Sequence, residues 1–313
     1  MGTNNNKTSG YVALCITSIG WGSTWVTSKI AIGHMPAFQM TSIRQFLGGL
    51  CFVLFFALYK KLPLPTGKQF IWLTIMSILM FVLANGLSTY SLKFIPTGLS
   101  SLIGALYPLC VVLIEYVFFK TKNITLLTVL GLLLGLGGVA IVFYENAFNA
   151  HHINFYWGLL LAVCAMLAWS IGSMVIARNK LHLNPYYATG WQMLIGAVIL
   201  FFIAKATGPI MPLQQIPTTA WLAIAYLVIM GSLICFIAFI YSMKKLPPAL
   251  FSLYAYLNPL VAMAISAWVL KEHISINIVW GAIVTLLGVF LVNYSIKKST
   301  KLLHNDKELF DEV

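Results

Sequence analysis

Long apolar stretches recur along the whole chain and are separated by short polar breaks. A helix needs about 20 mostly apolar residues to cross roughly 30 Å of hydrocarbon, and each stretch is long enough. The pattern predicts ten membrane-spanning helices, at residues 11–33, 37–59, 69–92, 97–119, 124–144, 155–177, 185–205, 218–243, 248–270 and 275–296. Because most breaks are short and hold proline or lysine, consecutive helices should pack as antiparallel hairpins. The predicted fold class is therefore all-α integral membrane.

The composition favours a membrane protein over a soluble one. Apolar residues make up 60% of the chain and charged residues 8%, with a mean hydropathy of +0.90. A soluble protein carries roughly 25% charged residues, so a soluble fold with this sequence could not cover its surface. The first apolar stretch is also longer than the apolar region of a signal peptide, so we expect it to stay in the protein as the first span.

The basic residues predict the orientation. The net charge of +12 does not indicate a nucleic-acid partner, because the basic residues lie in the breaks and form no patch or stripe. If the N-terminus is cytoplasmic, most of them fall on the inner side, among them Lys60, Lys61, Lys120, Lys122, Arg178, Lys180, Lys244 and Lys245. The outer ends then hold Lys29, Lys93, Lys205 and Lys271. The positive-inside rule thus predicts cytoplasmic termini in a multi-pass protein of the cell inner (plasma) membrane.

The second half of the chain repeats the first. With offsets of 148 to 151 residues, Ser91 to Pro96 matches Ser242 to Pro247, Ser101 matches Ser252, Pro108 matches Pro259, Gly131 and Gly138 match Gly281 and Gly288, and Trp21 matches Trp169. We therefore predict two repeats, at residues 11–146 and 153–296. They lie between a cytoplasmic N-terminal segment (1–10) and a cytoplasmic tail (297–313).

The predicted number of helices in each repeat has a functional consequence. A unit of five helices crosses the membrane an odd number of times, so the second copy must begin on the opposite side from the first. Inverted repeats of this kind are a recurrent plan of secondary transporters. Two such halves can exchange conformations, which gives inward-open and outward-open states similar energies.

Several motifs recur in a fixed order along residues 10–296. They are Trp21-Gly22-Ser23-Thr24-Trp25 followed by Pro36, Phe38 and Arg44, the run from Pro96 to Pro108, its copy from Pro247 to Leu260, and Glu272. Together they resemble the motifs of the drug/metabolite transporter superfamily, and specifically its ten-helix EamA-type transporters. This resemblance implies export or exchange of a solute, with a central cavity lined by helices 1, 3, 4, 6, 8 and 9. One departure is that Thr121 stands in the first repeat where Glu272 stands in the second.

Three charged residues are candidates for coupling or substrate recognition. Arg44 lies within the second span, where a guanidinium costs at least ~2.5–3.5 kcal/mol, so it should face protein or water. It could meet an anionic substrate group or cap carbonyls near the outer mouth. Glu115 is either a proton-coupling carboxyl or a charged group at the cytoplasmic interface. Its depth differs from that of Arg44 by ~11 residues, roughly 16 Å, which is too far for an ion pair. Glu272 closes the ninth span and is the third candidate.

Prolines and aromatic residues suggest a cavity. Pro108 and Pro259 lie near the middle of their spans, where each frees a carbonyl that is tolerated best beside a cavity; close helix packing by small residues is the alternative. Deep aromatic and amide side chains would suit an amphipathic solute, although any one of them can equally be a packing residue. The full set of cavity candidates is Trp21, Asn85, Tyr90, Ser101, Tyr107, Pro108, Trp169, Tyr241, Ser252, Tyr256, Asn258 and Pro259.

These features favour a secondary transporter that exports or exchanges a small organic metabolite, which is amino acid-like, amphipathic or drug-like. A channel or a receptor that does not transport is the alternative. A membrane enzyme is less favoured, because it needs a nucleophile–base or carboxylate pair at membrane depth and the chain has one deep acid and no deep histidine. The expected partners are a small-molecule substrate, the lipid bilayer, and protons or a counter-substrate. We expect no nucleic acid, metal or cofactor, and a monomer or homodimer.

Overall fold

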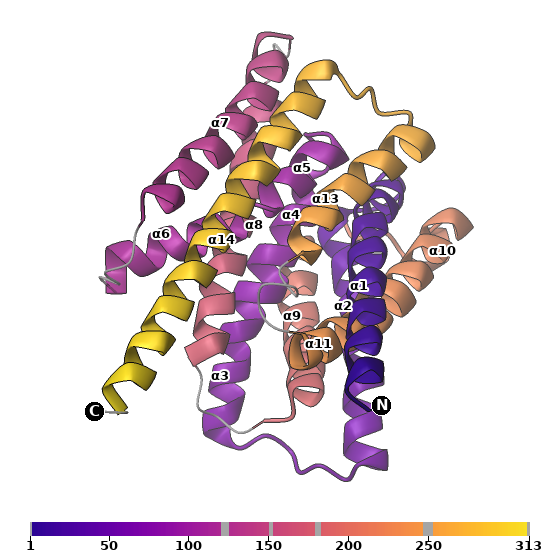
Figure 1. Ribbon diagram of the computed structural model, residues 1–313. Helices are drawn as coiled ribbons and strands as arrows, with labels where there is room; N and C mark the ends of the chain where they lie inside the picture. The colour runs from indigo at the N-terminus through magenta and orange to yellow at the C-terminus, as the bar shows by residue number, and fades with distance from the viewer. Residues whose placement is uncertain (1, 120–124, 150–152, 179–182, 247–252, 312–313) are drawn as a thin grey trace.

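The protein is a bundle of helices (Figure 1). The computed structural model describes residues 2–119, 125–149, 153–178, 183–246 and 253–311, and these residues form no β-strand. Each stretch predicted to span the membrane is occupied, where it is described, by one helix or by consecutive helical segments.

The first half holds α1 (Gly2–Ile32), α2 (Ala37–Leu54) with the π-helical η1 (Phe55–Tyr59), α3 (Gly67–Ser77) with the π-helical η2 (Ile78–Gly86) and α4 (Leu87–Ser91), α5 (Thr97–Gly104), α6 (Tyr107–Phe119) and α7 (Leu126–Asn149). The second half holds α8 (Ile153–Arg178), α9 (Pro185–Thr207), the 3₁₀ turn η3 (Leu213–Gln215), α10 (Thr218–Tyr226) with the π-helical η4 (Leu227–Ile234) and α11 (Cys235–Lys245), α13 (Tyr254–Ile265) with the π-helical η5 (Ser266–Leu270), and α14 (Ile276–Asp311). Helix therefore extends into both segments that were predicted to flank the repeats.

The helix starts follow from local sequence. Pro36 and Pro96 immediately precede α2 and α5, since proline has no N–H and fits the start of a helix better than its interior. The side chain of Thr66 caps α3 in a reciprocal capping box with Gln69. Asn184 caps α9 by accepting from the backbone N–H of Tyr186 at 3.0 Å.

The surface is apolar over much of its extent. Leu58, Phe118, Leu126 and Trp268 are each more than 70% exposed, as expected of side chains that contact lipid. Seven helical stretches among the described residues are long and apolar enough to span a membrane, and Leu126–Val142 and Tyr254–Leu270 are shorter apolar helices. The prediction of ten spans also needs these two helices and α1 to cross, and it stays a prediction.

Two helix pairs approach each other through glycine. In the pair α7 and α14, a Cβ at Gly131 would lie 2.7 Å from the carbonyl oxygen of Gly288. In the pair α2 and α9, a Cβ at Gly49 would lie 2.8 Å from the carbonyl oxygen of Gly190. Small residues allow membrane helices to pack at such short range, where dispersion contacts between backbones stabilise the pair.

The contacts of the two halves correspond to each other. Helix α1, from the first half, packs against η4, α11 and α13 of the second half. Helix α8, from the second half, packs against η2, α4, α5 and α6 of the first half. The π-helical segments η2 and η4 occur at matching places in the sequence, beginning at Ile78 and Leu227.

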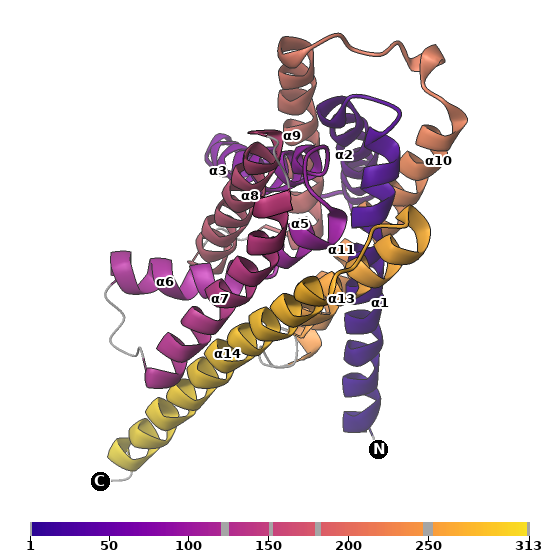
Figure 2. The ribbon, with the colours of Figure 1, turned by 90° about the horizontal axis from the view of Figure 1, so that it is seen from above.

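The ends of the chain lie at one end of the bundle. Figure 1 shows the start of α1 and the end of α14 at the bottom, and the link from α13 to α14 at the top. The view from above in Figure 2 shows the diagonal α7–α14 pair and α6, which projects sideways from the bundle. This arrangement is compatible with termini on the same side of a membrane, and which side that is stays a prediction.

Candidate functional site

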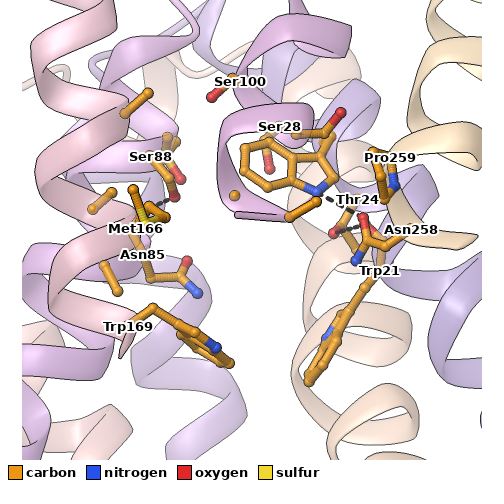
Figure 3. Close-up of a pocket in the computed structure, with 18 of the residues that line it drawn as sticks. Trp21, Thr24, Ser28, Asn85, Ser88, Ser100, Met166, Trp169, Asn258 and Pro259 are labelled. Carbon is orange, nitrogen blue, oxygen red and sulfur yellow. Dashed lines mark hydrogen bonds between the residues drawn. The ribbon is translucent and has the colours of Figure 1, made fainter. Parts of the chain in front are cut away.

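A cavity of about 170 Å³ lies between the two halves, and Figure 3 shows it. Its walls come from α1, α2, η2, α4, α5, α6, α8, α11 and α13. The residues that line it are Trp21, Thr24, Trp25, Ser28, Arg44, Ala84, Asn85, Ser88, Thr89, Leu92, Ser100, Ser101, Gly104, Ala105, Tyr107, Ala162, Ala165, Met166, Trp169, Phe236, Tyr254, Ala255, Asn258 and Pro259.

The structure brings many of the predicted site residues together around this cavity. The cavity candidates among the lining residues are Trp21, Asn85, Ser101, Tyr107, Trp169, Asn258 and Pro259, and Arg44 joins them from the charged set. Their role in substrate binding stays a prediction. Ser252 and Thr121 lie outside the described residues.

Other candidates lie away from the cavity and have structural partners there. The ring of Tyr90 stacks on Phe38, with centroids 4.7 Å apart. The hydroxyl of Tyr241 lies 3.1 Å from that of Ser9, and the hydroxyl of Tyr256 accepts from the amide of Asn293. These three side chains are on predicted spans, but they leave their helices on faces that do not line the cavity.

Each of the two candidate prolines follows a cavity-lining residue by four positions. Pro108 lies in the first turn of α6 after a break from α5, and Pro259 lies inside α13. Neither can donate to the carbonyl four residues earlier. Those carbonyls belong to Gly104 and Ala255, and both residues line the cavity. Pro259 itself also lines the cavity, whereas Pro108 does not.

Aromatic side chains form one end of the cavity. Figure 3 shows Trp21 and Trp169 facing each other, and their ring centroids are 6.4 Å apart in an edge-to-face arrangement. Trp21 also contacts Phe236, Phe239 and Tyr254, with centroids 5.2, 4.9 and 6.0 Å away. Aromatic pairs at these separations add stability beyond the burial of their area.

Hydrogen bonds hold the polar ends of these rings. Trp21 Nε1 donates to the carbonyl of Gly231 at 3.1 Å, and Trp25 Nε1 donates to Asn258 Oδ1 at 3.0 Å. The hydroxyl of Tyr254 donates to that of Tyr107 at 2.9 Å. Each of these three bonds joins a residue of the first half to one of the second.

The side-chain amide of Asn85 has no hydrogen-bond partner among the described residues, and Figure 3 shows it pointing into the cavity. Asn85 lies in η2, and π-helical turns are frequent at functional sites. An amide carries both donor and acceptor atoms, so it can bind either kind of polar group on a solute.

Arg44 is buried at the cavity wall. Its side chain is 6% exposed, and its Nε donates to the hydroxyl of Ser232 at 3.2 Å. It makes no ion pair with any residue that the structure describes. The two roles left open by the sequence were binding an anion and capping carbonyls, and its lining position is compatible with the first.

Glu115 lies outside the cavity, where it forms an ion pair with Arg178 at 3.1 Å. Both side chains are about two-fifths exposed, at 38% and 41%. The sequence-based argument that Glu115 is too deep to reach Arg44 agrees with this pairing. The surroundings favour the interfacial role of Glu115 over a buried, proton-carrying one.

Glu272 joins the halves beyond the other end of the cavity. Its carboxylate accepts from the backbone N–H of Thr97 at 3.1 Å and from the Thr97 hydroxyl at 2.8 Å. Thr97 is the first residue of α5, so the charge also lies at the positive end of that helix. Nearby, the ammonium of Lys29 donates to the carbonyls of Leu92 and Ile95.

Several lining residues were missed by the sequence analysis, although helical spacing could have found them. Thr24, Trp25 and Ser28 follow Trp21 at three, four and seven residues, so they share its face of α1. Ser88, Thr89 and Leu92 follow Asn85 in the same way, and Ala162, Ala165 and Met166 precede Trp169. In α1, η2–α4 and α8, one correctly placed candidate therefore gives the other residues of the lining face.

The comparison with known proteins identifies the family. The model of the EamA-like transporter family matches residues 8–144 and again residues 156–294. The chain belongs to the EamA-like transporter family. Together with its apolar helices, this membership makes it a multi-pass protein of the plasma membrane.

Curated relatives of this EamA-like chain carry transporter names. It is 29% identical to the uncharacterized transporter sll0355 of Synechocystis sp., over 93% of this chain and 91% of that protein. It is 28% identical to the uncharacterized inner membrane transporter YedA of Escherichia coli, over 90% of this chain and 89% of that protein. A solved crystal structure covers 92% of this chain with a TM-score of 0.62 at 19% identity, and 97% of that chain is matched. This structural likeness supports the fold.

Proposed function

We propose that the protein is a secondary transporter that exports or exchanges a small organic metabolite by alternating access of two inverted five-helix repeats. The observation that carries this proposal is the cavity, which lies between the halves and is lined by equivalent helices from both. Trp21 of α1 and Trp169 of α8 face each other at one end of it and hold matching positions of the sequence.

The correspondence between the halves supports the inverted repeats. The family model matches the chain twice, α1 and α8 have corresponding contacts, and η2 and η4 are matching π-helical segments. The pairs α2–α9 and α7–α14 each join equivalent helices, which is compatible with a two-fold axis between the halves. Halves related in this way can exchange conformations with little change in energy.

The contacts also suggest which parts move. One group contains α1, η4, α11 and α13, and the other contains α8, η2 and α4. The cavity lies between the groups, with the Glu272–Thr97 contact beyond one end and the Trp21–Trp169 cluster at the other. Rocking one group against the other would break one set of contacts at a time. Each opening would then expose the cavity to one side of the membrane.

Flux through proteoliposomes tests the proposal. Vesicles that contain the purified protein are preloaded with the low-molecular-weight extract of its host cells, and mass spectrometry follows exchange of extract solutes against the isotopically labelled extract outside. We expect at least one solute to exchange at a rate that saturates with concentration. Flux that rises linearly with concentration would indicate a pore, and exchange no faster than in empty vesicles would contradict transport.

A pair of tryptophan variants provides the control. Trp169→Ala removes an indole ring that lines the cavity, whereas Trp268→Ala removes a ring that is 77% exposed and does not line the cavity. We expect exchange to fall several-fold in Trp169→Ala and to stay close to wild type in Trp268→Ala. Equal rates in both variants would show that the cavity is not the transport site.

A further inference from the structure

The charge of Arg44 has no counter-charge in the described part of the chain. The side chain is 6% exposed within α2, and a guanidinium in a membrane-spanning segment normally pairs with an acid or with carbonyls. Its Nε bonds the hydroxyl of Ser232, and its two amino nitrogens have no hydrogen-bond partner among the described residues. Both amino nitrogens of a residue that lines the cavity are therefore without a partner in the described part of the chain.

Gly231 lets the guanidinium of Arg44 pack closely against η4. Gly231, in η4, passes so close that a Cβ there would lie 2.9 Å from Arg44 Nη2 and 2.9 Å from Thr24 Cγ2. The missing side chain lets the guanidinium lie between α1 and η4, and both Thr24 and Arg44 line the cavity.

The remaining lining restricts the charge of the solute. None of the lining residues that the structure describes is acidic, and Arg44 is the one Lys or Arg among them. Lys29, on the same helix as Trp25, is held by two backbone carbonyls and does not line the cavity. A solute with one negative charge is thus matched, whereas an amine would meet an unpaired positive charge and no carboxylate.

The size and the aromatic walls restrict the rest of the solute. The cavity volume of about 170 Å³ is similar to the ~150 Å³ of an apolar cavity that holds benzene. Trp21, Trp25 and Trp169 offer ring faces and edges, and Asn85 offers one free amide. A planar carboxylate fits the two N–H groups of an arginine fork in a bidentate pair.

We infer that Arg44 binds the carboxylate of the transported solute, which is an organic monoanion with an apolar body of about one aromatic ring. This inference rests on the proposed function, because it assigns the chemistry of the substrate to the same cavity. It also explains how a buried arginine is kept in α2: the solute supplies the partner that the protein lacks.

The test uses three probes with one body and three charges: phenylacetate, phenylacetamide and phenethylamine. Proteoliposomes preloaded with an equimolar mixture are assayed for counterflow of each labelled probe. For the wild type we expect phenylacetate to move saturably and at least tenfold faster than the other two. In Arg44→Gln the phenylacetate rate should fall by roughly tenfold to a hundredfold, the range for losing a hydrogen bond to a charged group.

Controls separate recognition from folding. Arg178→Gln removes an arginine that pairs with Glu115 outside the cavity, and it should keep the wild-type preference. Arg44→Lys keeps the charge but not the fork, so it should retain a reduced preference for phenylacetate. Gly231→Ala displaces the guanidinium without removing it and should lower the phenylacetate rate more than the phenylacetamide rate. Detergent size-exclusion profiles show which variants fold.

The wild type alone can overturn the inference even if every Arg44 variant fails to fold. Equal or faster counterflow of phenylacetamide or phenethylamine would contradict carboxylate recognition and leave the transporter proposal intact. Exchange of host-extract solutes without any movement of phenylacetate would likewise contradict carboxylate recognition and leave the transporter proposal intact. If neither the extract solutes nor any probe moves saturably, both proposals are wrong.

Discussion

The carboxylate of Glu272 accepts hydrogen bonds from the backbone N–H and the hydroxyl of Thr97, at 3.1 and 2.8 Å. Thr97 begins α5 in the first half of the chain, and Glu272 follows η5 in the second half. The contact therefore joins the two repeats at a helix N-terminus, where a negative charge is stabilised. It lies beyond the cavity residue Ser100 and away from the aromatic cluster of Trp21.

If this contact closes the outer end, its loss should open the cavity to the outside. A charge-assisted hydrogen bond contributes about 1.5–3 kcal/mol, enough to shift a two-state ratio by roughly tenfold or more. We expect Glu272→Ala to increase labelling of Ser28→Cys by a membrane-impermeant thiol reagent added outside, in a background where the five native cysteines are alanine. Glu272→Gln keeps an acceptor and should give an intermediate rate.

Glu115→Ala is the matched control for that experiment. It also removes an acid that joins the two halves, but through Arg178 and outside the cavity. Its labelling rate should equal that of the parent. Equal labelling in Glu272→Ala and Glu115→Ala would show that the Glu272–Thr97 contact does not close the cavity.

Close packing of α7 on α14 should make one of two neighbouring glycines intolerant of substitution. A Cβ at Gly138 would overlap Thr285 and the carbonyl of Gly281, whereas a Cβ at Gly137 would meet nothing within 4 Å. Overpacking of a tight contact typically costs about 1–3 kcal/mol. Gly138→Ala should therefore lower the melting temperature in detergent by several degrees, and Gly137→Ala should leave it unchanged. Matching losses in the two variants would contradict the helix pairing.

Hydropathy predicted the helical stretches because a lipid-spanning helix must be apolar over its whole length. It could not supply the face that each side chain takes. Tyr256 lies at a similar depth in its predicted span to Tyr107, yet Tyr256 bonds Asn293 while Tyr107 lines the cavity. Tyr90, near the end of its span, stacks on Phe38 away from the cavity. Depth along a helix follows from counting residues, but direction around it follows from packing.

The internal repeat partly indicated which side chains face the cavity, which hydropathy could not predict. Trp21 and Trp169, which recur in the two halves, both line the cavity, although other recurring residues such as Pro108 do not. Arg44 and Asn85 were found by a different signal, since polar groups at membrane depth need a reason to be there. Trp25 and Ser28 were not singled out by recurrence in the two halves or as polar groups at membrane depth. Only their spacing from Trp21 relates them to the cavity.

The hydrogen bond from Trp25 to Asn258 should matter for transport, because it fixes an indole in the cavity wall across the two halves. Asn258→Ala leaves the indole N–H without its acceptor at 3.0 Å, a loss of about 0.5–1.5 kcal/mol. We expect counterflow to fall by roughly threefold to tenfold. Asn293→Ala, which removes the amide that donates to Tyr256 outside the cavity, should have a smaller effect on the rate at equal expression. A larger loss in Asn293→Ala would place the important contact elsewhere.

Glu115 is the carboxyl that its depth in sequence makes the obvious proton carrier, but its surroundings predict otherwise. It is 38% exposed, pairs with Arg178 and does not line the cavity, so we expect this carboxyl to have no part in substrate access. Glu115→Gln should leave the pH profile of counterflow where it is and change the stability by no more than about 1 kcal/mol, as for an exposed ion pair. Arg178→Gln should behave in the same way, since it removes the other half of the pair. A pH profile that moves in Glu115→Gln but not in Arg178→Gln would return the coupling role to this carboxyl. Both variants break the same ion pair, so a purely structural role would give both the same effect.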